Sequence, residues 1–161
     1  MIKKFKIIAL ILFALISFKG ISGVQAIFNY KQFMAPSKEI YIESYLSFVS
    51  SSLKYKNVEN PVLQARLLVT QYIKQNGKIL DFKKYKVLGP ELKDSVAVDF
   101  KDQQRFVLVP GYYQVEIEVL DLNDSSETPT LTSRTINIEG YNKKINLSDI
   151  ELIDYFNKTD K

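Results

Sequence analysis

The sequence contains no cysteine, no histidine and no tryptophan among its 161 residues. Histidine is the most frequent general base and transition-metal ligand, and cysteine is the usual thiol nucleophile and zinc ligand. Their absence excludes a Ser-His-Asp triad, thiol catalysis, and tetrahedral zinc or iron–sulfur sites. Six scattered glycines form neither G-x-G-x-x-G nor G-x-x-x-x-G-K-[ST], the loops that bind phosphate. We therefore expect no catalytic residues, no metal site and no cofactor, and we expect that the protein is not an enzyme.

The first residues have the three parts of a secretory signal peptide. Three lysines and no acid occur in residues 1–6, residues 7–18 are almost wholly apolar, and Val24-Gln25-Ala26 fits the small-x-small cleavage pattern. The apolar run is shorter than the roughly 20 residues of a bilayer-spanning helix. We expect a signal peptide at 1–26, one domain at 27–161, and no membrane span after cleavage. The protein is then exported, and is periplasmic, outer-membrane-associated or secreted; an uncleaved anchor is the alternative.

The predicted mature chain has no surplus of positive charge. Four of the 22 basic residues and none of the 18 acidic residues lie in 1–26, so residues 27–161 carry 18 of each. A protein that follows nucleic-acid phosphates needs an excess of Lys and Arg, so we expect no nucleic-acid partner. Without cysteine, this exported domain has no disulfide and folds by packing alone.

Period-two alternation of apolar and polar residues predicts an all-β chain. Asn76-Gly77 separates two of the runs and predicts a two-residue hairpin turn, whereas the polar stretch 91–104 predicts a connection or a weak edge strand. Seven or eight strands predict an immunoglobulin/fibronectin-III-like two-sheet β-sandwich. The predicted strands are 40–48, 63–73, 78–88, 106–109, 113–119, 130–138 and 145–153. The predicted core contains Ile42, Leu46, Phe48, Leu67, Val69, Phe106, Val115, Ile117 and Val119.

The last predicted strand has a competing interpretation. A strand over 145–153 would direct Ile150 inward and close the sandwich. Ser148-Asp149-Ile150-Glu151 also matches a helix capping box, so a C-terminal helix is the alternative.

The stretch Leu108 to Asn123, LVPGYYQVEIEVLDLN, resembles the late hairpin of extracytoplasmic immunoglobulin-like and fibronectin-type-III-like domains. The resemblance implies a tyrosine corner, in which the hydroxyl of Tyr113 bonds to the backbone just upstream. Together with Asn146 to Leu152, NLSDIEL, the stretch is similar to the β-sandwich region that precedes the conserved domain in GWxTD-domain-containing exported proteins of Bacteroidota. The GWxTD motif itself is absent. The resemblance implies no catalytic residues, and implies a family module standing alone or a fragment of a longer chain.

Acidic residues supply two weaker signals. Asp121, Asn123, Asp124 and Glu127 are oxygen ligands that Ca²⁺ accepts, but their spacing is not that of an EF-hand, and an acidic turn is the favoured interpretation. Glu116 and Glu118 lie two apart on a predicted strand and so share its solvent face. A hydrolase that uses carboxylates alone is the least favoured function.

Two sequence patterns suggest glycosylation. Asp94-Ser95-Val96 resembles the O-glycosylation acceptor motif of exported Bacteroidota proteins, which makes Ser95 a candidate site. Asn123, Asn146 and Asn157 match the N-glycan acceptor pattern.

Ten tyrosines give the chain a high content of amphipathic rings. We assign several of them to strand faces opposite the core, as a candidate binding surface for a protein or glycan of the cell envelope; ordinary cross-strand pairing is the alternative. The residues assigned to this surface are Tyr41, Tyr45, Tyr72, Tyr85 and Tyr112. The predicted function is a non-catalytic cell-envelope module for protein interaction or structural support, with a glycan-binding module as the alternative.

Overall fold

The computed structural model describes residues 23–59, 62–92, 96–126, 128–141 and 147–150. Nearly all of the regular structure in these residues is β-strand. The only exception there is a short 3₁₀ helix, η1 (Ser50–Ser52). The strands are β1 (Ala26–Met34), β2 (Ile40–Phe48), β3 (Lys56–Glu59), β4 (Val62–Gln64), β5 (Arg66–Gln75), β6 (Lys78–Leu88), β7 (Phe100–Val107), β8 (Gly111–Asp121) and β9 (Thr130–Ile138).

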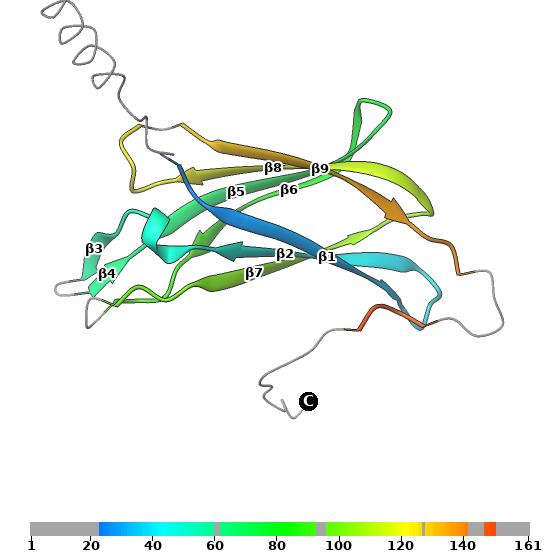
Figure 1. The fold of residues 1–161 in the computed structure, drawn as a ribbon, viewed down its shortest axis with the longest axis horizontal. Helices are drawn as coiled ribbons and strands as arrows, with labels where there is room; N and C mark the ends of the chain where they lie inside the picture. Colours follow the sequence, from blue (N-terminus) through cyan, green and yellow to red (C-terminus); the bar gives the residue numbers. More distant parts are fainter. Residues whose placement is uncertain (1–22, 60–61, 93–95, 127, 142–146, 151–161) are drawn as a thin grey trace, which may run out of the picture.

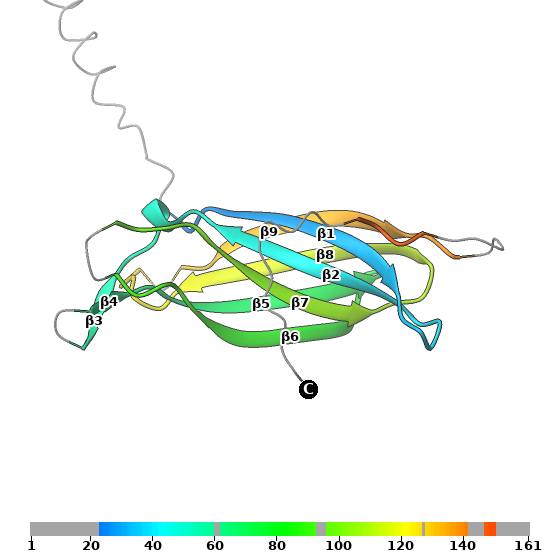
Figure 2. The same ribbon diagram turned by 90° about the horizontal axis from the view of Figure 1, so that it is seen from below.

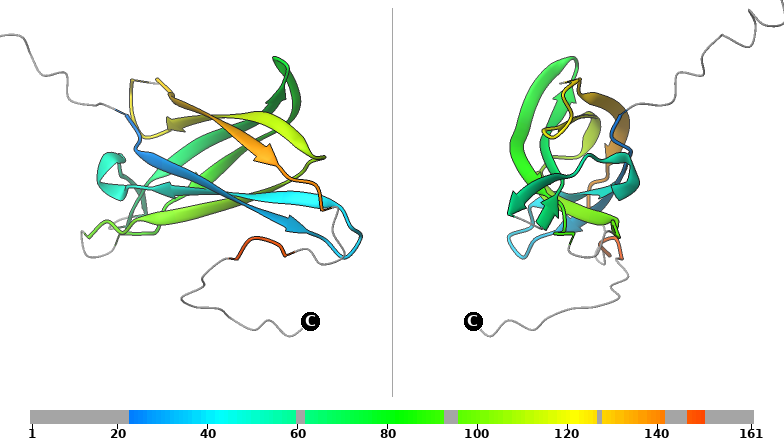
Figure 3. Two further views of the ribbon diagram at one scale, coloured as in Figure 1. Left: turned by 45° about the vertical axis from the view of Figure 1, so that its right-hand side comes forward. Right: turned by 90° about the vertical axis from the view of Figure 1, so that its left-hand side faces the viewer.

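Two antiparallel sheets face each other across a shared interior (Figures 1 and 2). One sheet has the order β1-β2-β7, and the other has the order β6-β5-β8-β9. Strands β3 and β4 form a separate small hairpin. The end-on view in Figure 3 shows both sheets curving around the interior. The predicted all-β sandwich is therefore confirmed, with the three strands of one sheet facing the four of the other, as in immunoglobulin/fibronectin-III-like domains.

The interior is filled by alternate residues of the strands in both sheets. All nine residues of the predicted core are buried, with at most 2% of any of them exposed. Burying a side chain of this size contributes about 1.5–3 kcal/mol. On β8, Val115, Ile117 and Val119 face inward while Gln114 and Glu116 face away. Ile73, Ile136 and Ile138 complete the centre of the core.

The hairpin between β5 and β6 has the predicted turn. Asn76 and Gly77 have φ values of 51° and 76°, and positive φ at both central residues is the requirement of a type I′ turn. The pairing shifts near the tip, because Ile73 lies opposite Asp81 whereas Lys74 lies opposite Ile79. Leu80 is therefore the extra residue of a β-bulge. This hairpin projects beyond the body of the sandwich (green loop at the upper right of Figure 1).

Strand β7 is longer than predicted and begins earlier. The prediction placed a strand at 106–109 and, over 91–104, a connection or a weak edge strand, whereas β7 is a single edge strand that spans Phe100–Val107. Its inward-facing positions include Asp102 and Gln104 between Phe100 and Phe106. These two polar residues interrupt the apolar alternation, which is why the pattern gave only a connection or a weak edge strand for the first part of β7. Strand β1 was also not predicted.

The described residues 147–150 lie beside the edge of β1. The Asp149 N–H donates to the Gln32 carbonyl (3.0 Å), and the Gln32 N–H donates to Asp149 Oδ2 (2.7 Å). The Ser148 hydroxyl accepts from the Met34 N–H (3.2 Å), so Ser148 contacts a neighbouring strand. Ile150 is 77% exposed, so the prediction that it points into the core is wrong. The rest of the predicted last strand lies outside the described residues.

Packed residues precede the predicted cleavage position. Val24 is only 7% exposed and belongs to the core cluster, and its N–H donates to Thr130 Oγ1 (3.1 Å). The Gln25 carbonyl accepts from the Val49 N–H (3.0 Å). The described domain thus includes residues that cleavage after Ala26 would remove.

We predict that a chain beginning at Ile27 is less stable than one beginning at Val24. The shorter chain loses the buried Val24 side chain and the hydrogen bonds of residues 24 and 25, at a cost of about 1–3 kcal/mol. Urea denaturation of both purified chains measures the difference. Val24→Ala in the longer chain should show a smaller loss, and equal stability of the two chains would contradict the packing of Val24.

Candidate functional site

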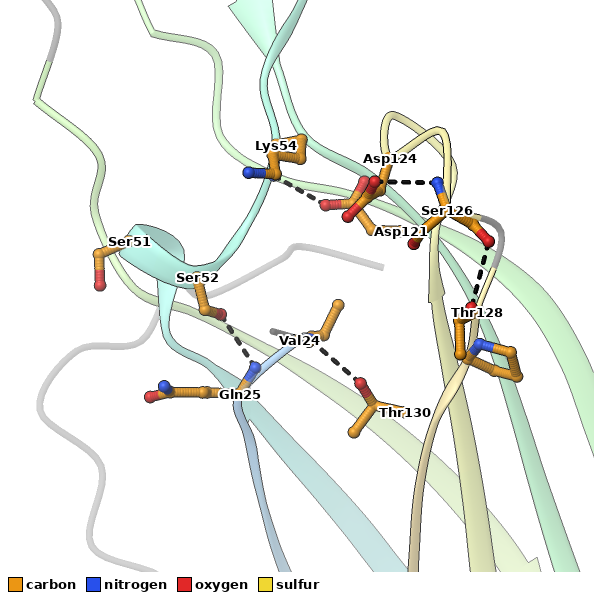
Figure 4. Close-up of a pocket in the computed structure, with 12 residues that line it drawn as sticks. Val24, Gln25, Ser51, Ser52, Lys54, Asp121, Asp124, Ser126, Thr128 and Thr130 are labelled. Atoms are coloured by element: carbon orange, nitrogen blue, oxygen red, sulfur yellow. Dashed lines mark hydrogen bonds between the residues drawn. The ribbon is translucent and has the colours of Figure 1, made fainter. Parts of the chain in front are cut away.

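A polar pocket lies at the end of the sandwich where β1 begins and β8 ends (Figure 4). Its volume is about 480 Å³, and its walls come from the start of β1, from η1 and from the β8–β9 connection. Serine, threonine and aspartate side chains dominate the lining, together with Lys54. The pocket contains two of the acidic residues that suggested a calcium site, Asp121 and Asp124.

The acidic side chains of the pocket support the loop backbones. Asp121 accepts from the Lys54 N–H (2.7 Å) and from the Asn123 N–H (2.8 Å), one bond on each carboxylate oxygen. Asp124 Oδ1 accepts from the Ser126 N–H (3.0 Å). Among the described residues, no three acidic side chains gather as a metal site requires, and Glu127 lies outside them. The arrangement is that of an acidic turn.

Asn123 ties three segments together beside this pocket. It is 4% exposed, and its amide nitrogen donates to the carbonyls of Lys54 (2.9 Å) and Gln64 (2.8 Å). Its amide oxygen accepts from Arg66 Nε (3.2 Å). A side chain that is buried and bonded in this way does not accept a glycan in the folded domain. The other two N-glycan candidates, Asn146 and Asn157, lie outside the described residues, as does Ser95.

A chain of polar side chains crosses the interior between the two sheets. Ser44 on β2 donates to Gln71 Oε1 on β5 (2.5 Å), and Gln71 Nε2 donates to the Tyr85 hydroxyl on β6 (2.6 Å). Tyr85 in turn donates to Asp102 Oδ2 on β7 (2.6 Å). Ser44 and Gln71 are fully buried. Each side chain in this series is hydrogen-bonded to the next. The series therefore joins both sheets without leaving these buried amide and hydroxyl groups unpaired.

The environment of Tyr85 disfavours its ionised form. Burial is the main cause, and the Asp102 carboxylate next to the hydroxyl adds to it, so the pKa of Tyr85 is raised above the usual 10.0. The group therefore stays a neutral hydrogen-bond donor wherever the domain is folded near neutral pH. The role of this network is structural, and it joins the edge strands β6 and β7.

The five tyrosines assigned to one binding surface occupy three separate places. Tyr41 and Tyr45 lie on the outer face of the three-stranded sheet, while Tyr72 and Tyr112 lie on the outer face of the four-stranded sheet. Tyr85 faces the interior, so its assignment to a surface is wrong. Alternation along one strand assigns a face, but only the folding of strands into two sheets decides which faces adjoin.

Tyr41 and Tyr45 surround a buried carboxylate. Glu43 is 6% exposed although it lies on an outer face, because Arg105 bonds to it (2.7 Å) and the Tyr45 hydroxyl donates to it. Arg105 also lies over the Tyr41 ring (5.3 Å), and Phe33 stacks on the same ring, with 5.6 Å between the Phe33 and Tyr41 ring centroids. These contacts are cross-strand pairs of the kind that was the alternative interpretation to a tyrosine binding surface.

Exposed apolar side chains gather at the tip of the β5–β6 hairpin. Ile79, Leu80 and Phe82 are 52%, 55% and 58% exposed, and the Tyr72 ring stacks with Phe82 at a centroid distance of 6.2 Å. We call these four residues the hairpin patch. Tyr112, 70% exposed, lies on β8 near the turn, where its carbonyl accepts from Gln75 Nε2 (3.3 Å). This patch was not predicted, although the apolar pair Ile79-Leu80, one residue after the Asn-Gly turn, departs from alternation and was a visible signal.

Two other predicted features lie on β8. Tyr113 is 2% exposed and its hydroxyl donates to the Val109 carbonyl (2.8 Å), the hydrogen bond expected of a tyrosine corner. Glu116 and Glu118 both lie on the outer face of the sheet, and Glu116 is paired with Lys74 (2.8 Å). These two carboxylates therefore lie in a row on the solvent-facing side of β8.

Fold and site together define an all-β sandwich domain with a projecting apolar hairpin. No protein-family model matches the chain, and no curated protein is significantly similar to it. Within the part of the chain that the structure describes, no helix has the length and hydropathy that crossing a bilayer requires.

We predict that Tyr85→Phe destabilises the domain and changes its response to alkali. Loss of the hydroxyl leaves the Gln71 amide without its acceptor, at a cost of about 1–3 kcal/mol near neutral pH. Because the folded pKa lies above the unfolded one, the stabilisation is complete below about pH 10 and is lost as the pH rises through the folded pKa. Urea denaturation from neutral to alkaline pH should show a shallower alkaline decline in the variant.

The exposed Tyr112→Phe is the matched control and should leave both quantities unchanged. Burial also raises the pKa of Tyr55, so part of the alkaline decline should remain in every variant. An alkaline decline in Tyr85→Phe as steep as in the wild type would contradict the assignment.

We predict that Asn123→Asp is more destabilising than Asn123→Ala. The aspartate has the same shape, but it would place a carboxylate oxygen against the carbonyls of Lys54 and Gln64 where the amide now donates. The alanine leaves those carbonyls and the Arg66 Nε–H without their partner, at about 1–3 kcal/mol. The aspartate keeps the acceptor for Arg66, but it adds the repulsion of a buried carboxylate against two carbonyl oxygens. Urea denaturation ranks the two variants, and the reverse order would contradict the geometry.

Proposed function

We propose that the protein is an exported, non-catalytic cell-envelope module that acts by interaction, and that the hairpin patch is its contact surface. The observation that carries the proposal is the exposure of three apolar side chains, each more than half accessible, at one projecting tip. Soluble monomers expose isolated apolar residues routinely, but an exposed cluster is typical of an interaction site.

The hairpin is well suited to present the patch because it is held in one conformation. The type I′ turn fixes the tip, β5 pairs with β8 along most of its length, and Lys74 links β5 to Glu116. The same Lys74 ammonium lies over the Tyr72 ring (5.4 Å). A surface that is already ordered loses little conformational entropy on binding.

Two predictions from the sequence agree with an envelope location. The N-terminal segment has the pattern of a signal peptide, and the late hairpin resembles the region preceding the GWxTD domain of exported proteins. Both stay predictions. Glycan recognition is the alternative function, supported by the exposed Tyr112 ring and the stacked rings of Tyr72 and Phe82 on the outer face of the same sheet.

We predict that replacing Ile79 and Phe82 by serine abolishes partner capture without unfolding the domain. The measurement is cross-linking of the exported protein in intact cells, followed by its recovery with any bound protein, and a glycan array run with the same variants. Leu88→Ser is the matched control, because Leu88 lies on the same strand with the same 58% exposure but outside the patch. A protein or glycan that is captured equally by the wild type and by the patch variants would contradict the proposed contact surface.

A further inference from the structure

We propose that the hairpin patch and the lysines behind it dock onto the anionic lipid surface of a membrane. The inference rests on the proposed function, since it names the partner of the same surface. It concerns a peripheral contact made by a β-hairpin.

Positive charge is concentrated on the strand that carries the patch. Strand β6 contains four lysines and a single acid, Asp81, in eleven residues, although residues 27–161 have no net charge. Lys78, Lys84 and Lys86 are exposed. Lys83 is directed differently, because its ammonium donates to Gln104 (3.3 Å) and lies over the Phe106 ring (5.1 Å).

The lysines stand behind the apolar tip at a spacing that suits a membrane surface. Phe82, Lys84 and Lys86 lie opposite Tyr72, Thr70 and Leu68, so all three share the outer face of the sheet. At about 3.3 Å per residue, Lys84 lies about 7 Å and Lys86 about 13 Å behind Phe82. The apolar faces of interfacial helices penetrate about 5–10 Å into the boundary between headgroups and acyl chains, and we take the same depth for this hairpin. With Phe82 inserted, both ammonium groups reach the headgroup layer.

Aromatic and acidic neighbours fit the same arrangement. Tyr72 and Tyr112 flank the tip, and tyrosine is favoured at membrane interfaces because its ring is apolar and its hydroxyl is polar. Among the nearby acids, Glu116 is neutralised by Lys74. Asp81 is exposed, but it lies opposite the inward-facing Ile73 and therefore on the other face of β6 from Phe82, Lys84 and Lys86. Glu118 lies on the outer face beyond β5, opposite Thr70.

The form of the patch favours a lipid surface over a protein partner. Protein hot spots are typically side chains that fill pockets of a partner, within an interface of substantial area. Here the apolar groups form a narrow tip with a lysine cluster on one side, the combination that binds anionic lipid by insertion and charge together. The polar pocket lies at the other end of β8 and includes none of the patch residues.

Vesicle sedimentation of the purified exported chain tests the proposal. One set of vesicles is phosphatidylcholine with an equal part of phosphatidylglycerol, and the other is phosphatidylcholine alone. We expect binding to the anionic set only, weakened by added salt. Phe82→Ser removes the inserted ring and should reduce binding to the anionic vesicles roughly tenfold or more. The double variant Lys84→Glu/Lys86→Glu reverses the charge behind the tip and should also reduce binding roughly tenfold or more. Leu88→Ser and Lys56→Glu, both away from the patch, are the matched controls.

Circular dichroism and urea denaturation establish that each variant is folded. Absence of binding to anionic vesicles, equal binding to neutral ones, or equal loss in Leu88→Ser and Phe82→Ser would each overturn the lipid assignment. If vesicles fail while protein or glycan capture still requires Phe82, the lipid partner is wrong and the proposed function stands. If neither measurement depends on Phe82, both proposals are wrong.

Discussion

Burial of alternating side chains between two sheets is the interaction on which the rest of the structure depends. Every second residue of β2, β5 and β8 enters the same interior, and the domain has no disulfide to add to this packing. Where an inward position is polar, as at Gln71 and Asp102, the side chain must find a partner there, because a buried unpaired polar group costs as much as a lost core methyl group or more. The hydrogen-bond chain through Tyr85 meets that requirement across both sheets.

The two ends of the sandwich use their polar and apolar residues in opposite ways. At the pocket end, the side chains of Asp121 and Asn123 form hydrogen bonds with backbone groups of the loops. These bonds stabilise the loops, so the polar residues of the pocket have a structural role. At the hairpin end, the bulge at Leu80 and the projection of the strands leave apolar side chains without cover. The proposed contact surface therefore lies at the hairpin end, where apolar side chains stay exposed to solvent.

Prediction from sequence succeeded where one local rule was sufficient. The Asn76-Gly77 turn depends only on positive φ at adjacent residues, and the core of β8 depends only on strict alternation. It failed where a residue's role depends on a distant strand. Polar residues at inward positions of β7 left its first part as a connection or a weak edge strand. Tyr85 was placed on a surface because its partners on β5 and β7 are remote in sequence.

By itself, the amino-acid sequence determined the all-β class, the composition of the core and the absence of histidine and cysteine chemistry, since these follow from residue type and from period-two spacing. Only the tertiary structure decided which faces adjoin. It separated the predicted tyrosine surface into three places, assigned Asp121 to loop support, and brought Tyr72 beside Phe82 at an uncovered tip. The physical reason is that alternation specifies a face of each strand, whereas neighbours across a sheet or between sheets are set by register and packing of segments far apart in the chain.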